Sequence, residues 1–555
     1  MIMAMYSHPS RFVILAITGF LSSASAFAQS HNGSTTEPPK LAVVIVVDQM
    51  RSDYLDRFST RFTGGLARLL REGTHFTHAY QHHSATETAV GHATLSTGCY
   101  PSHHGIVGNS WYDQEIQKVV SAVGDTNSPL VGSDSRGGAS PRNLQRPALG
   151  DRLKEKYPLS KVYAIALKDR SAILMGGKHP DGAFWYDRNT GNYVTSKYYS
   201  DTLPSVVETF NRARLVDSLR VGGWHRLLPE SEYSLSHRDS FPAENDGVNI
   251  TFPHQFDSLK TPKDIYTAFY STPFADQLTF QLARRIVTAM QLGRDNAPDL
   301  LWISCSAADA IGHAFGPNSQ EAEDYYLRLD RYLDTFLTVL DTEVGSANYV
   351  TVLTADHGAM IMPEDQITRG YHSERIGLDS VVARTLQAGD SAAAELHLAK
   401  NPIVSGDYEI ILNYVESRAK GLDDSVVQSA VARRVVRLQF IDAAFTATQL
   451  ASSSASDEPL LELVRNAYHP TRHPDIYLVY SENHLVENDP HGTTHGSPFE
   501  YDRHIPLIIS GAGIIPGLNT SEVHSIDITP SLAVLLGVPL PTDIDGRQLQ
   551  LKGPE

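Results

Sequence analysis

Cysteine is scarce in this chain: only two occur among its 555 residues, Cys99 and Cys305. Two cysteines cannot form the dense disulfide framework that supports small secreted domains, so a disulfide scaffold is excluded. The two side chains either pair with each other in an oxidising compartment or remain two buried free thiols, and both alternatives stay open. The chain is long enough to bury a large hydrophobic core without covalent links.

Basic residues are in the minority. The sequence has 46 lysines and arginines against 63 aspartates and glutamates, a formal net charge of −17. An acidic protein of this kind is repelled by the phosphate backbone, so we expect no nucleic acid as a routine partner. An anionic substrate would have to be attracted by cations placed close to its binding site.

Long apolar runs are also missing beyond the N-terminus, where no segment has the uninterrupted length of a transmembrane helix. Near the N-terminus, Arg11 precedes a short apolar run at residues 12–20, which leads to Ala26-Phe27-Ala28. This pattern is typical of a signal peptide cleaved after Ala28, and the run is short for the alternative, a membrane anchor. We therefore expect a signal peptide at residues 1–28, a flexible lead at residues 29–40, and a periplasmic or secreted mature protein without a transmembrane segment.

Patterns of buried strands alternate with helical patterns along the chain. The run 41–47 is β-branched and lacks polar alternation, which predicts a strand buried on both faces. Three further runs share this character: residues 162–167, 299–304 and 349–354. Helical patterns lie between them, including residues 274–292 and 321–340. The alternation predicts an α/β fold with a doubly wound, mainly parallel sheet and helices on both faces.

Two long segments interrupt this alternation, at about 176–263 and 360–472, and both are richer in polar, aromatic and turn residues. We interpret them as insertions that cap the sheet. Strand patterns then resume at residues 474–480 and 505–510, and a closing helix is predicted at 528–536. No repeat of fixed period is evident, so residues 41–555 are expected to form one domain with two inserted cap regions.

Carboxylates and imidazoles occur in four motifs, three of which follow predicted strands: Asp48, Asp309-Ala-Ile-Gly-His313, Asp356-His357 and His495. Ligands bind at the carboxyl ends of the strands in such sheets, so these motifs can meet at one edge. Oxygen and nitrogen ligands of this kind suit Zn²⁺, and two metal ions are the natural interpretation.

The motifs differ in strength. Asp309 and His313 are four residues apart, so one helical turn puts them on the same side, but this spacing alone more often marks a surface pair. The pair Asp356-His357 is more specific, because charges that end a buried strand are costly unless something compensates them.

Thr88 stands at the start of a predicted helix, residues 89–97. On this segment alone, the first interpretation is a helix N-cap. The N-terminus of a helix also favours an anion, and a hydroxyl coordinated by a metal is deprotonated near neutral pH and becomes a nucleophile. The metal-ligand motifs elsewhere in the chain give this second interpretation its weight.

Taken together, these motifs resemble the alkaline phosphatase superfamily, and within it the phosphate-irrepressible alkaline phosphatases that have a threonine nucleophile. The resemblance extends from Leu41 to about Gly546, with several separated segments in the family's order. It implies an alkaline phosphatase-like fold and zinc-dependent hydrolysis of phosphate monoesters. The reaction would pass through a phosphothreonine on Thr88 and release inorganic phosphate.

The resemblance also implies a set of ligands for two Zn²⁺ ions. One ion would be held by Asp48, Thr88, Asp356 and His357, and the other by Asp309, His313 and His495. Asn109 follows Thr88 at the spacing of the family's phosphate-binding asparagine. Because Asp and His sites also accept Mn²⁺ or Co²⁺, the identity of the metal depends on the resemblance.

The motif Lys168-Asp-Arg170, which follows the strand 162–167, bears on the choice of substrate. By resemblance, the monoesterases carry a K-x-R pair here that contacts phosphate, whereas the related nucleotide pyrophosphatases/phosphodiesterases lack it. A monoester dianion has one more unesterified oxygen than a diester, which Arg170 can engage by its planar fork while Lys168 adds a point charge. Phosphate monoesters are therefore the expected substrates, and a phosphodiesterase or nucleotide pyrophosphatase of the same fold is the alternative.

Two other interpretations have less support. The segment Cys99-Tyr-Pro-Ser-His103 is similar to the C-x-P-x-R motif of sulfatases, but His103 replaces the arginine and Thr88 already fills the nucleophile's place. A non-catalytic zinc-binding or phosphate-binding envelope protein need not retain Thr88 beside both ligand sets. Histidines close to the nucleophile segment are expected to be structural or exposed, outside the ligand set: His75, His78, His82, His83, His92, His103 and His104.

Overall fold

The computed structural model describes residues 38–406, 409–452, 458–539 and 542–551. The predicted signal peptide and most of the predicted lead segment lie outside these residues. Within them, none of the helices has both the length and the apolar character needed to cross a membrane. Cys99 and Cys305 are both buried and free, so the second of the two alternatives for the cysteines describes this structure.

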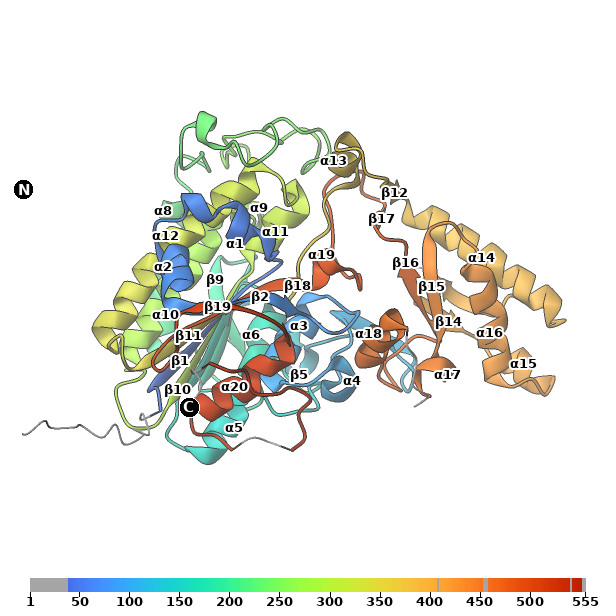
Figure 1. Ribbon diagram of the computed structural model, residues 1–555, viewed down its shortest axis with the longest axis horizontal. Coiled ribbons are helices and arrows are strands. Elements are labelled where there is room, and N and C mark those ends of the chain that lie inside the picture. The colour runs from blue at the N-terminus through green and yellow to red at the C-terminus, as the bar shows by residue number, and fades with distance from the viewer. Residues whose placement is uncertain (1–37, 407–408, 453–457, 540–541, 552–555) are drawn as a thin grey trace, which may run out of the picture. The chain divides into compact units, whose positions relative to one another are not determined.

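A sheet of eleven strands forms the centre of the fold, in the order β19-β2-β18-β11-β1-β10-β7-β8-β9-β5-β6 (Figure 1). Its middle strands are parallel: β1 (Leu41–Val47), β7 (Val162–Ala166), β8 (Gly182–Asp187), β10 (Asp299–Cys305) and β11 (Tyr349–Thr354). All residues of β1, β7, β10 and β11 are buried, as their unbroken apolar runs predict for strands covered on both faces. The predicted α/β fold with a mainly parallel sheet is confirmed.

Strands at the two sides of the sheet break the parallel order. On one side lie β2 (Gly73–Tyr80), β18 (His504–Gly511) and β19 (Gly517–His524). Strand β18 is antiparallel to both β11 and β2. On the other side, antiparallel pairs join β8, β9 (Asn192–Ser196), β5 (Gly124–Val131) and β6 (Gly138–Ala139). Strands β8 and β9 lie within residues 176–263, so part of the expected first insertion continues the central sheet.

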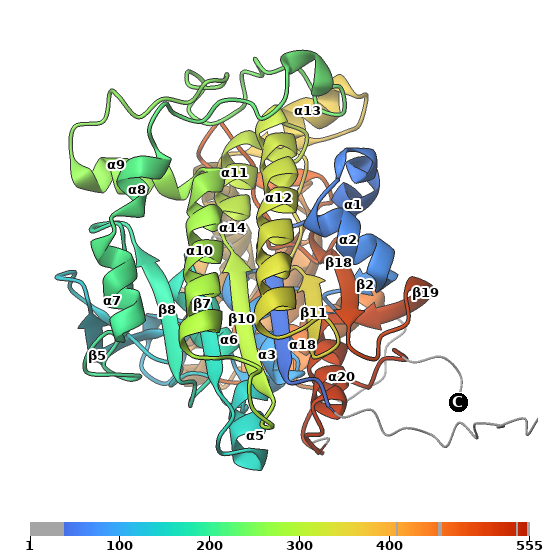
Figure 2. The ribbon, with the colours of Figure 1, turned by 90° about the vertical axis from the view of Figure 1, so that its left-hand side faces the viewer.

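Helices cover both faces of the sheet (Figure 2). One face carries α2 (Gly65–Glu72), α10 (Pro273–Ala289), α11 (Ala307–Phe315) and α12 (Gln320–Glu343), and the helices α10 and α12 stand in front of the sheet in Figure 2. The opposite face carries α3 (Thr88–Thr97), α5 (Leu149–Lys156), α6 (Asp169–Gly176) and α20 (Ile528–Leu535). The doubly wound arrangement is therefore complete on both sides.

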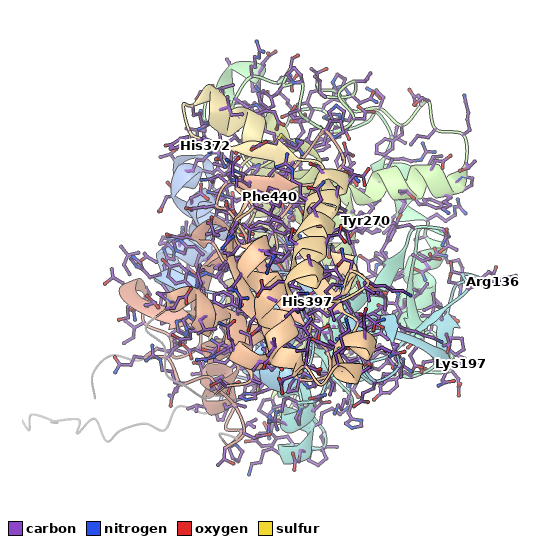
Figure 3. All side chains as sticks on the ribbon, turned by 90° about the vertical axis from the view of Figure 1, so that its right-hand side faces the viewer. Arg136, Lys197, Tyr270, His372, His397 and Phe440 are labelled. Atoms are coloured by element: carbon purple, nitrogen blue, oxygen red, sulfur yellow. The ribbon has the colours of Figure 1, made fainter. Side chains whose placement is uncertain are left out.

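A second, four-stranded sheet lies in the later part of the chain, in the order β13-β14-β16-β15. Its elements are β13 (Ile403–Gly406), β14 (Glu409–Leu412), β15 (Ile441–Thr446), β16 (Ile476–Tyr480), α14 (Leu378–Glu395) and α16 (Asp424–Val435). They enclose a separate hydrophobic core that includes Phe440, which is labelled beside these helices in Figure 3.

The strand predicted at residues 474–480 forms as β16, and it pairs with β14 and β15 of this second sheet. Its side chains Tyr477 and Tyr480 are only half-buried, unlike those of the central strands. An apolar run does not reveal which strands it will pair with, because the same pattern satisfies either sheet. The remaining elements are short: α1 (Asp53–Arg57), α4 (Pro101–His104), α7 (Ser205–Arg212), α8 (Leu215–Leu219), α9 (Pro262–Tyr270), α13 (Pro363–Thr368), α15 (Val415–Ala419), α17 (Ala447–Leu450), α18 (Pro459–Ala467), α19 (Glu500–Arg503), β3 (Ser110–Asp113), β4 (Lys118–Ser121), β12 (Glu374–Ile376) and β17 (His484–Val486).

Candidate active site

The candidate catalytic side chains lie at the carboxyl ends of the parallel strands. Asp48 directly follows β1, and Asp356 follows β11, which pairs with β1. Asp309 lies in the first turn of α11, immediately after β10, and Lys168 stands between β7 and α6. Because these strands are parallel and in register, segments from distant parts of the sequence end at the same edge of the sheet.

Thr88 is the first residue of α3, and every residue of this helix is buried. The helix passes very close to the segment that carries Asp356. A Cβ atom on Gly91 would lie 2.3 Å from the backbone oxygen of Asp356, a distance that no side chain tolerates. Glycine at this position therefore allows the N-terminus of α3, with Thr88, to lie beside the carboxylates.

Asp48, Asp356 and His357 form one group whose ligand atoms all lie within 4.8 Å of one another. All three side chains are fully buried. Nε2 of His357 lies 3.6 Å from Oδ1 of Asp48 and 3.5 Å from Oδ2 of Asp356. These are the protein residues, apart from Thr88, that the resemblance assigns to one metal ion.

Asp309, His357 and His495 form a second group within the same limit. His313 is adjacent, with Nε2 3.2 Å from Oδ1 of Asp309, and the Nε2 atom of His495 lies 3.5 Å from the same oxygen. The rings of His357 and His495 stack at 3.7 Å between centroids. His357 therefore lies between the two predicted ligand sets rather than beside one alone.

The three ligand histidines have the same orientation. Each uses Nδ1 to donate a hydrogen bond to a backbone carbonyl: His357 to Gly358 at 2.9 Å, His313 to Thr493 at 2.7 Å and His495 to Thr86 at 2.7 Å. Nε2 then carries the lone pair and faces the carboxylates. Fixing the tautomer in this way is the usual outer support of metal-ligating histidines.

Several of these atoms are buried without a well-directed hydrogen bond: both carboxylate oxygens of Asp48, Oδ2 of Asp356 and Nε2 of His357. Of these, Oδ2 of Asp48 meets the ammonium of Lys168 at 2.8 Å and Oδ2 of Asp356 meets Nδ1 of His92 at 3.1 Å, whereas the other two have no such contact among the described residues. Orphaned acceptors of this kind are costly unless a cation satisfies them. Burial and the charge of Asp356 raise the pKa of Asp48, while burial lowers the pKa of His357 to about 3, which keeps its imidazole neutral. The donor set and its missing partners fit bound metal ions.

Lys168 supplies the positive charge that lies among these carboxylates. Its Nζ lies 2.6 Å from Oδ2 of Asp309, 2.8 Å from Oδ2 of Asp48 and 3.0 Å from Oγ1 of Thr88. Burial lowers the pKa of Lys168, but Asp309 and Asp48 outweigh that effect and raise it above its usual value. The ammonium therefore remains charged, and it donates a hydrogen bond to the hydroxyl of Thr88, the predicted nucleophile.

The other two predicted anion-binding residues lie around Thr88 and Lys168. Oδ1 of Asn109 accepts a hydrogen bond from the backbone N–H of Ala89 at 3.0 Å. The backbone N–H of Asn109 donates to Oε2 of Glu87 at 2.7 Å. Arg170 lies in the first turn of α6, and its Nε is buried without a hydrogen-bond partner. The structure thus brings together all the site residues named from the sequence.

Two residues that contact the candidate ligands were not identified from the sequence. Gln49 has a positive φ of 66°, and it donates from its backbone N–H to Asp356 at 3.1 Å and from Nε2 to Asp309 at 3.0 Å. His92 was expected to be merely structural, but its Nδ1 lies 2.8 Å from the carbonyl oxygen of Thr88 and 3.1 Å from Oδ2 of Asp356. The available signal was its position one helical turn after Thr88, on the same side of α3.

A third residue that the sequence did not identify lies just after the expected first insertion (about 176–263) and interacts electrostatically with Lys168 and Asp309. Tyr270 ends α9, is labelled in Figure 3, and has a buried hydroxyl without a hydrogen-bond partner. Burial raises its pKa, whereas the charges of Lys168 and Arg188 lower it. The guanidinium of Arg188 lies 3.6 Å from the centre of the Tyr270 ring.

Comparisons with known proteins bear on the family of this chain. The sequence profile of the type I phosphodiesterase / nucleotide pyrophosphatase family matches residues 42–498. The chain is 35% identical to alkaline phosphatase PafA of Elizabethkingia meningoseptica over 97% of both chains. It is 33% identical to alkaline phosphatase PhoV of Synechococcus elongatus over 92% of both chains.

The crystal structure of wild-type alkaline phosphatase PafA superposes with a TM-score of 0.85 at 33% identity, covering 92% of this chain and 98% of that one. Murine ectonucleotide pyrophosphatase / phosphodiesterase 5 shares the fold, with a TM-score of 0.51 at 13% identity. The chain therefore belongs to the type I phosphodiesterase / nucleotide pyrophosphatase family of the alkaline phosphatase superfamily, and it is an alkaline phosphatase-type enzyme that hydrolyses phosphoesters.

Proposed function

We propose that this enzyme is a zinc-dependent phosphomonoesterase that acts through a phosphothreonine intermediate on Thr88. The observation that carries the proposal is the environment of the Thr88 hydroxyl. It stands at the N-terminus of a fully buried helix, 3.0 Å from the ammonium of Lys168, beside two groups of buried metal-type ligands. A hydroxyl that served only as a helix cap would need neither the cation nor the ligands.

Two Zn²⁺ ions fit the donor atoms at this site. Asp48, Thr88, Asp356 and His357 would hold one ion, and Asp309, His313 and His495 would hold the other. Bound in this way, the ions would supply Lewis-acid stabilisation of charge on the attacking and leaving oxygens. Three imidazole and carboxylate ligands for each ion, with the hydroxyl of Thr88 as a fourth donor at the first, agree with the preference of zinc for nitrogen and oxygen donors.

In the first step, Oγ1 of Thr88 attacks phosphorus in line with the ester oxygen. A bond from phosphorus to Thr88 forms, the bond to the alcohol breaks, the hydroxyl proton of Thr88 is released and the departing alkoxide takes up a proton. Lys168 donates a hydrogen bond to Oγ1 and stabilises its deprotonated form, since a charge-assisted hydrogen bond favours the anion. The N-terminal amides of α3 favour the same negative charge.

In the second step, water attacks phosphorus from the side that the alcohol left. The bond to Thr88 breaks, the threonine regains its proton, and inorganic phosphate is released. Each in-line displacement inverts the configuration at phosphorus, so the two together retain it. Hydrolysis of a chiral monoester in labelled water should therefore give retention.

Asn109, Lys168 and Arg170 would bind the non-bridging phosphate oxygens. The unpartnered Nε of Arg170 and the charge of Lys168 support this role, because fixed donors in a buried site stabilise developing charge strongly. A monoester dianion presents the additional oxygen that these two cations would engage. The alternative function is a phosphodiesterase or nucleotide pyrophosphatase, which the description of the matching family favours.

Turnover of nitrophenyl phosphate and bis-nitrophenyl phosphate distinguishes the two functions. We expect faster monoester hydrolysis, and a fall in its kcat/KM of about 10²–10³-fold in Lys168→Ala with Arg170→Ala, by analogy with the loss of charge-stabilising donors. Diester hydrolysis should change much less. Lys197→Ala, at an exposed position labelled in Figure 3, is the control and should change neither. Faster turnover of the diester by the wild-type enzyme would rule out the monoesterase.

Acid quenching during turnover tests the intermediate. Mass spectrometry of the peptide that contains Thr88 should show one added phosphoryl group, and Thr88→Ala should lose both this adduct and hydrolysis. Thr88→Ser, which keeps the hydroxyl, should retain a measurable part of both. Undiminished hydrolysis by Thr88→Ala would exclude Thr88 as the nucleophile.

We also propose export to the periplasm or the medium, on the basis of the pattern at residues 1–28 alone. N-terminal sequencing of the protein recovered outside the cytoplasm should begin at Gln29. Recovery there with an intact N-terminus would contradict cleavage.

A further inference from the structure

A second place in the molecule contains a carboxylate that lacks donors. Among the described residues, Asp48 and Glu244 have both carboxylate oxygens buried without a well-directed hydrogen bond. Asp48 at least meets the ammonium of Lys168 at 2.8 Å, whereas no lysine or arginine in the described part of the chain forms an ion pair with Glu244. Glu244 is completely buried and lies in the long segment between α8 and α9. A buried, unpartnered carboxylate is unfavourable unless it is protonated or a cation neutralises it.

Glu321 adds a second carboxylate. It lies in the first turn of α12 and is also completely buried. Its Oε1 accepts a hydrogen bond from Nε2 of His254 at 2.8 Å, but its Oε2 has no partner. Burial, followed by the charge of Glu321, raises the pKa of Glu244 to about 10. Gln320, the residue before Glu321, donates from Nε2 to the carbonyl of His237 at 3.3 Å, so the start of α12 lies beside the segment that carries Glu244.

His237 faces Glu244 with a nitrogen that cannot donate. Its Nδ1 lies 3.0 Å from the carbonyl oxygen of Arg238, and burial lowers its pKa, so the ring is neutral and Nδ1 carries the proton. The lone pair on Nε2 then lies 3.5 Å from Oε1 of Glu244. When Glu244 is ionised, two acceptors face each other and only a shared proton or a cation can lie between them. The orientation of His237 is the same that backbone carbonyls give to the three predicted ligand histidines of the active site.

We propose that Glu244, Glu321 and His237 bind a further divalent metal ion, outside the active site. A divalent ion would displace the proton from Glu244, and it would balance the charge of −2 that the two ionised carboxylates and a neutral imidazole then carry. Mixed oxygen and nitrogen donors suit Zn²⁺ or Mn²⁺ better than Ca²⁺, which prefers oxygen alone. The three donors do not all lie within 4.8 Å of one another, so the ion would draw Glu321 inward or bind it through water.

Other acidic side chains nearby already have partners and are not needed as ligands. Asp239 forms an ion pair with Arg226 at 2.8 Å. Asp365 accepts from Nδ2 of Asn318 at 2.6 Å and from Arg369 at 3.0 Å. The unpaired charge is therefore concentrated on Glu244 and Glu321.

The position of this site gives the ion a structural role. The backbone N–H of Asn245 donates to the carbonyl of Ala314, next to His313, at 2.6 Å, and Gly492 donates to Ala243 at 2.7 Å. In Figures 1 and 2 the green segment that contains Glu244 crosses the end of the sheet where α11 and α13 lie. An ion at Glu244 would fasten this segment against the chain that carries His313 and His495.

Metal content tests the proposal. The full-length protein is saturated with Zn²⁺ or Mn²⁺, desalted and analysed by mass spectrometry of the metal. We expect Glu244→Gln with Glu321→Gln to lose about one equivalent per chain relative to wild type. Glu323→Gln is the matched control, because Glu323 is buried on the same helix and also has an unpartnered oxygen. Equal metal content in the double variant and wild type overturns the proposal.

Anomalous diffraction from wild-type crystals soaked with Mn²⁺ tests it without any substitution. A peak is expected between Glu244, Glu321 and His237, and it should persist in Asp48→Asn, whose defect is confined to the active site. This separates the further site from the proposed function. Peaks at the active site with none at Glu244 would disprove the further site, whether or not the Gln variants fold.

Discussion

His92 joins the helix that carries Thr88 to the carboxylate of Asp356, with Nδ1 2.8 Å from the Thr88 carbonyl and 3.1 Å from Oδ2 of Asp356. On the opposite side of the ring, Nε2 lies 3.0 Å from Oγ of Ser304. A side chain that holds a metal ligand in place acts through that ligand. We therefore expect His92 to position the proposed ligand Asp356 rather than to bind metal itself.

We expect His92→Ala to weaken metal binding by about 10–100-fold, the usual effect of removing a group that supports a ligand. Competition with a chromophoric chelator measures this affinity directly, apart from activity. His92→Asn, whose amide can replace the Nδ1 contact, should restore part of it. His103→Ala is the control, since His103 is half-exposed and bonds to Asp545 far along the chain. An unchanged affinity in His92→Ala would refute this role.

Single residues were predictable from the sequence where they directly follow a strand. Asp48 and Asp356 end apolar runs, and the structure places both beside their expected neighbours. The contacts of Gln49 and His92 were not predictable, because they depend on how closely α3 packs against the segment at Asp356. Their roles, like those of the ligands, stay predictions until the variants are made.

At the scale of secondary structure elements, the close approach of α3 to the Asp356 segment depends on Gly91. A methyl group there would meet backbone atoms of Asp356 at 2.3 and 2.8 Å, so the helix would have to move away. These atoms of Asp356 belong to the backbone, which cannot move aside as a flexible side chain would.

Gly91→Ala should lower the free energy of unfolding by roughly 1–3 kcal/mol, the range for overpacking a close contact. Because the helix carries Thr88, kcat should fall as well. Chemical denaturation and steady-state kinetics measure the two effects. Gly377→Ala is the matched control: Gly377 has a φ of −62°, its added Cβ would meet only Oδ1 of Asn488 at 3.6 Å, and its effect should stay within about 0.5 kcal/mol. Equal effects of the two substitutions would show that the contact at Asp356 is not tight.

Elements that are buried on both faces were the ones predicted well. The runs that became β1, β7, β10 and β11 and the helices α10 and α12 were found to within a few residues. Strand β19 was missed, because most of its residues are exposed and its sequence lacks an apolar run. The partners of β16 could not be predicted, since pairing depends on residues far away in the sequence.

At the scale of the whole molecule, the active site places three buried carboxylates, Asp48, Asp309 and Asp356, around a single ammonium, Lys168. Such an excess of negative charge opposes folding, and bound cations relieve it. The stability of the whole protein should therefore depend on metal.

Thermal unfolding checks this dependence. Zn²⁺ at 100 times its Kd should add about 2.7 kcal/mol per site to the free energy of unfolding, and a chelator should lower the melting temperature by a corresponding amount. Asp48→Asn with Asp309→Asn removes two of the charges and should make the melting temperature nearly independent of the chelator. A wild-type melting temperature that the chelator leaves unchanged would contradict the prediction.

The antiparallel strand β18 has a consequence for how the enzyme is made. It lies between β2 and β11, so the side of the sheet that holds β2 and β19 cannot join the rest until residues 504–511 have left the ribosome. His495 is translated only shortly before them, hundreds of residues after Asp48 and Thr88. A nascent chain that ends before these residues therefore lacks a proposed metal ligand and a central strand, and we expect phosphoester hydrolysis to begin only after residues 504–511 have been synthesised.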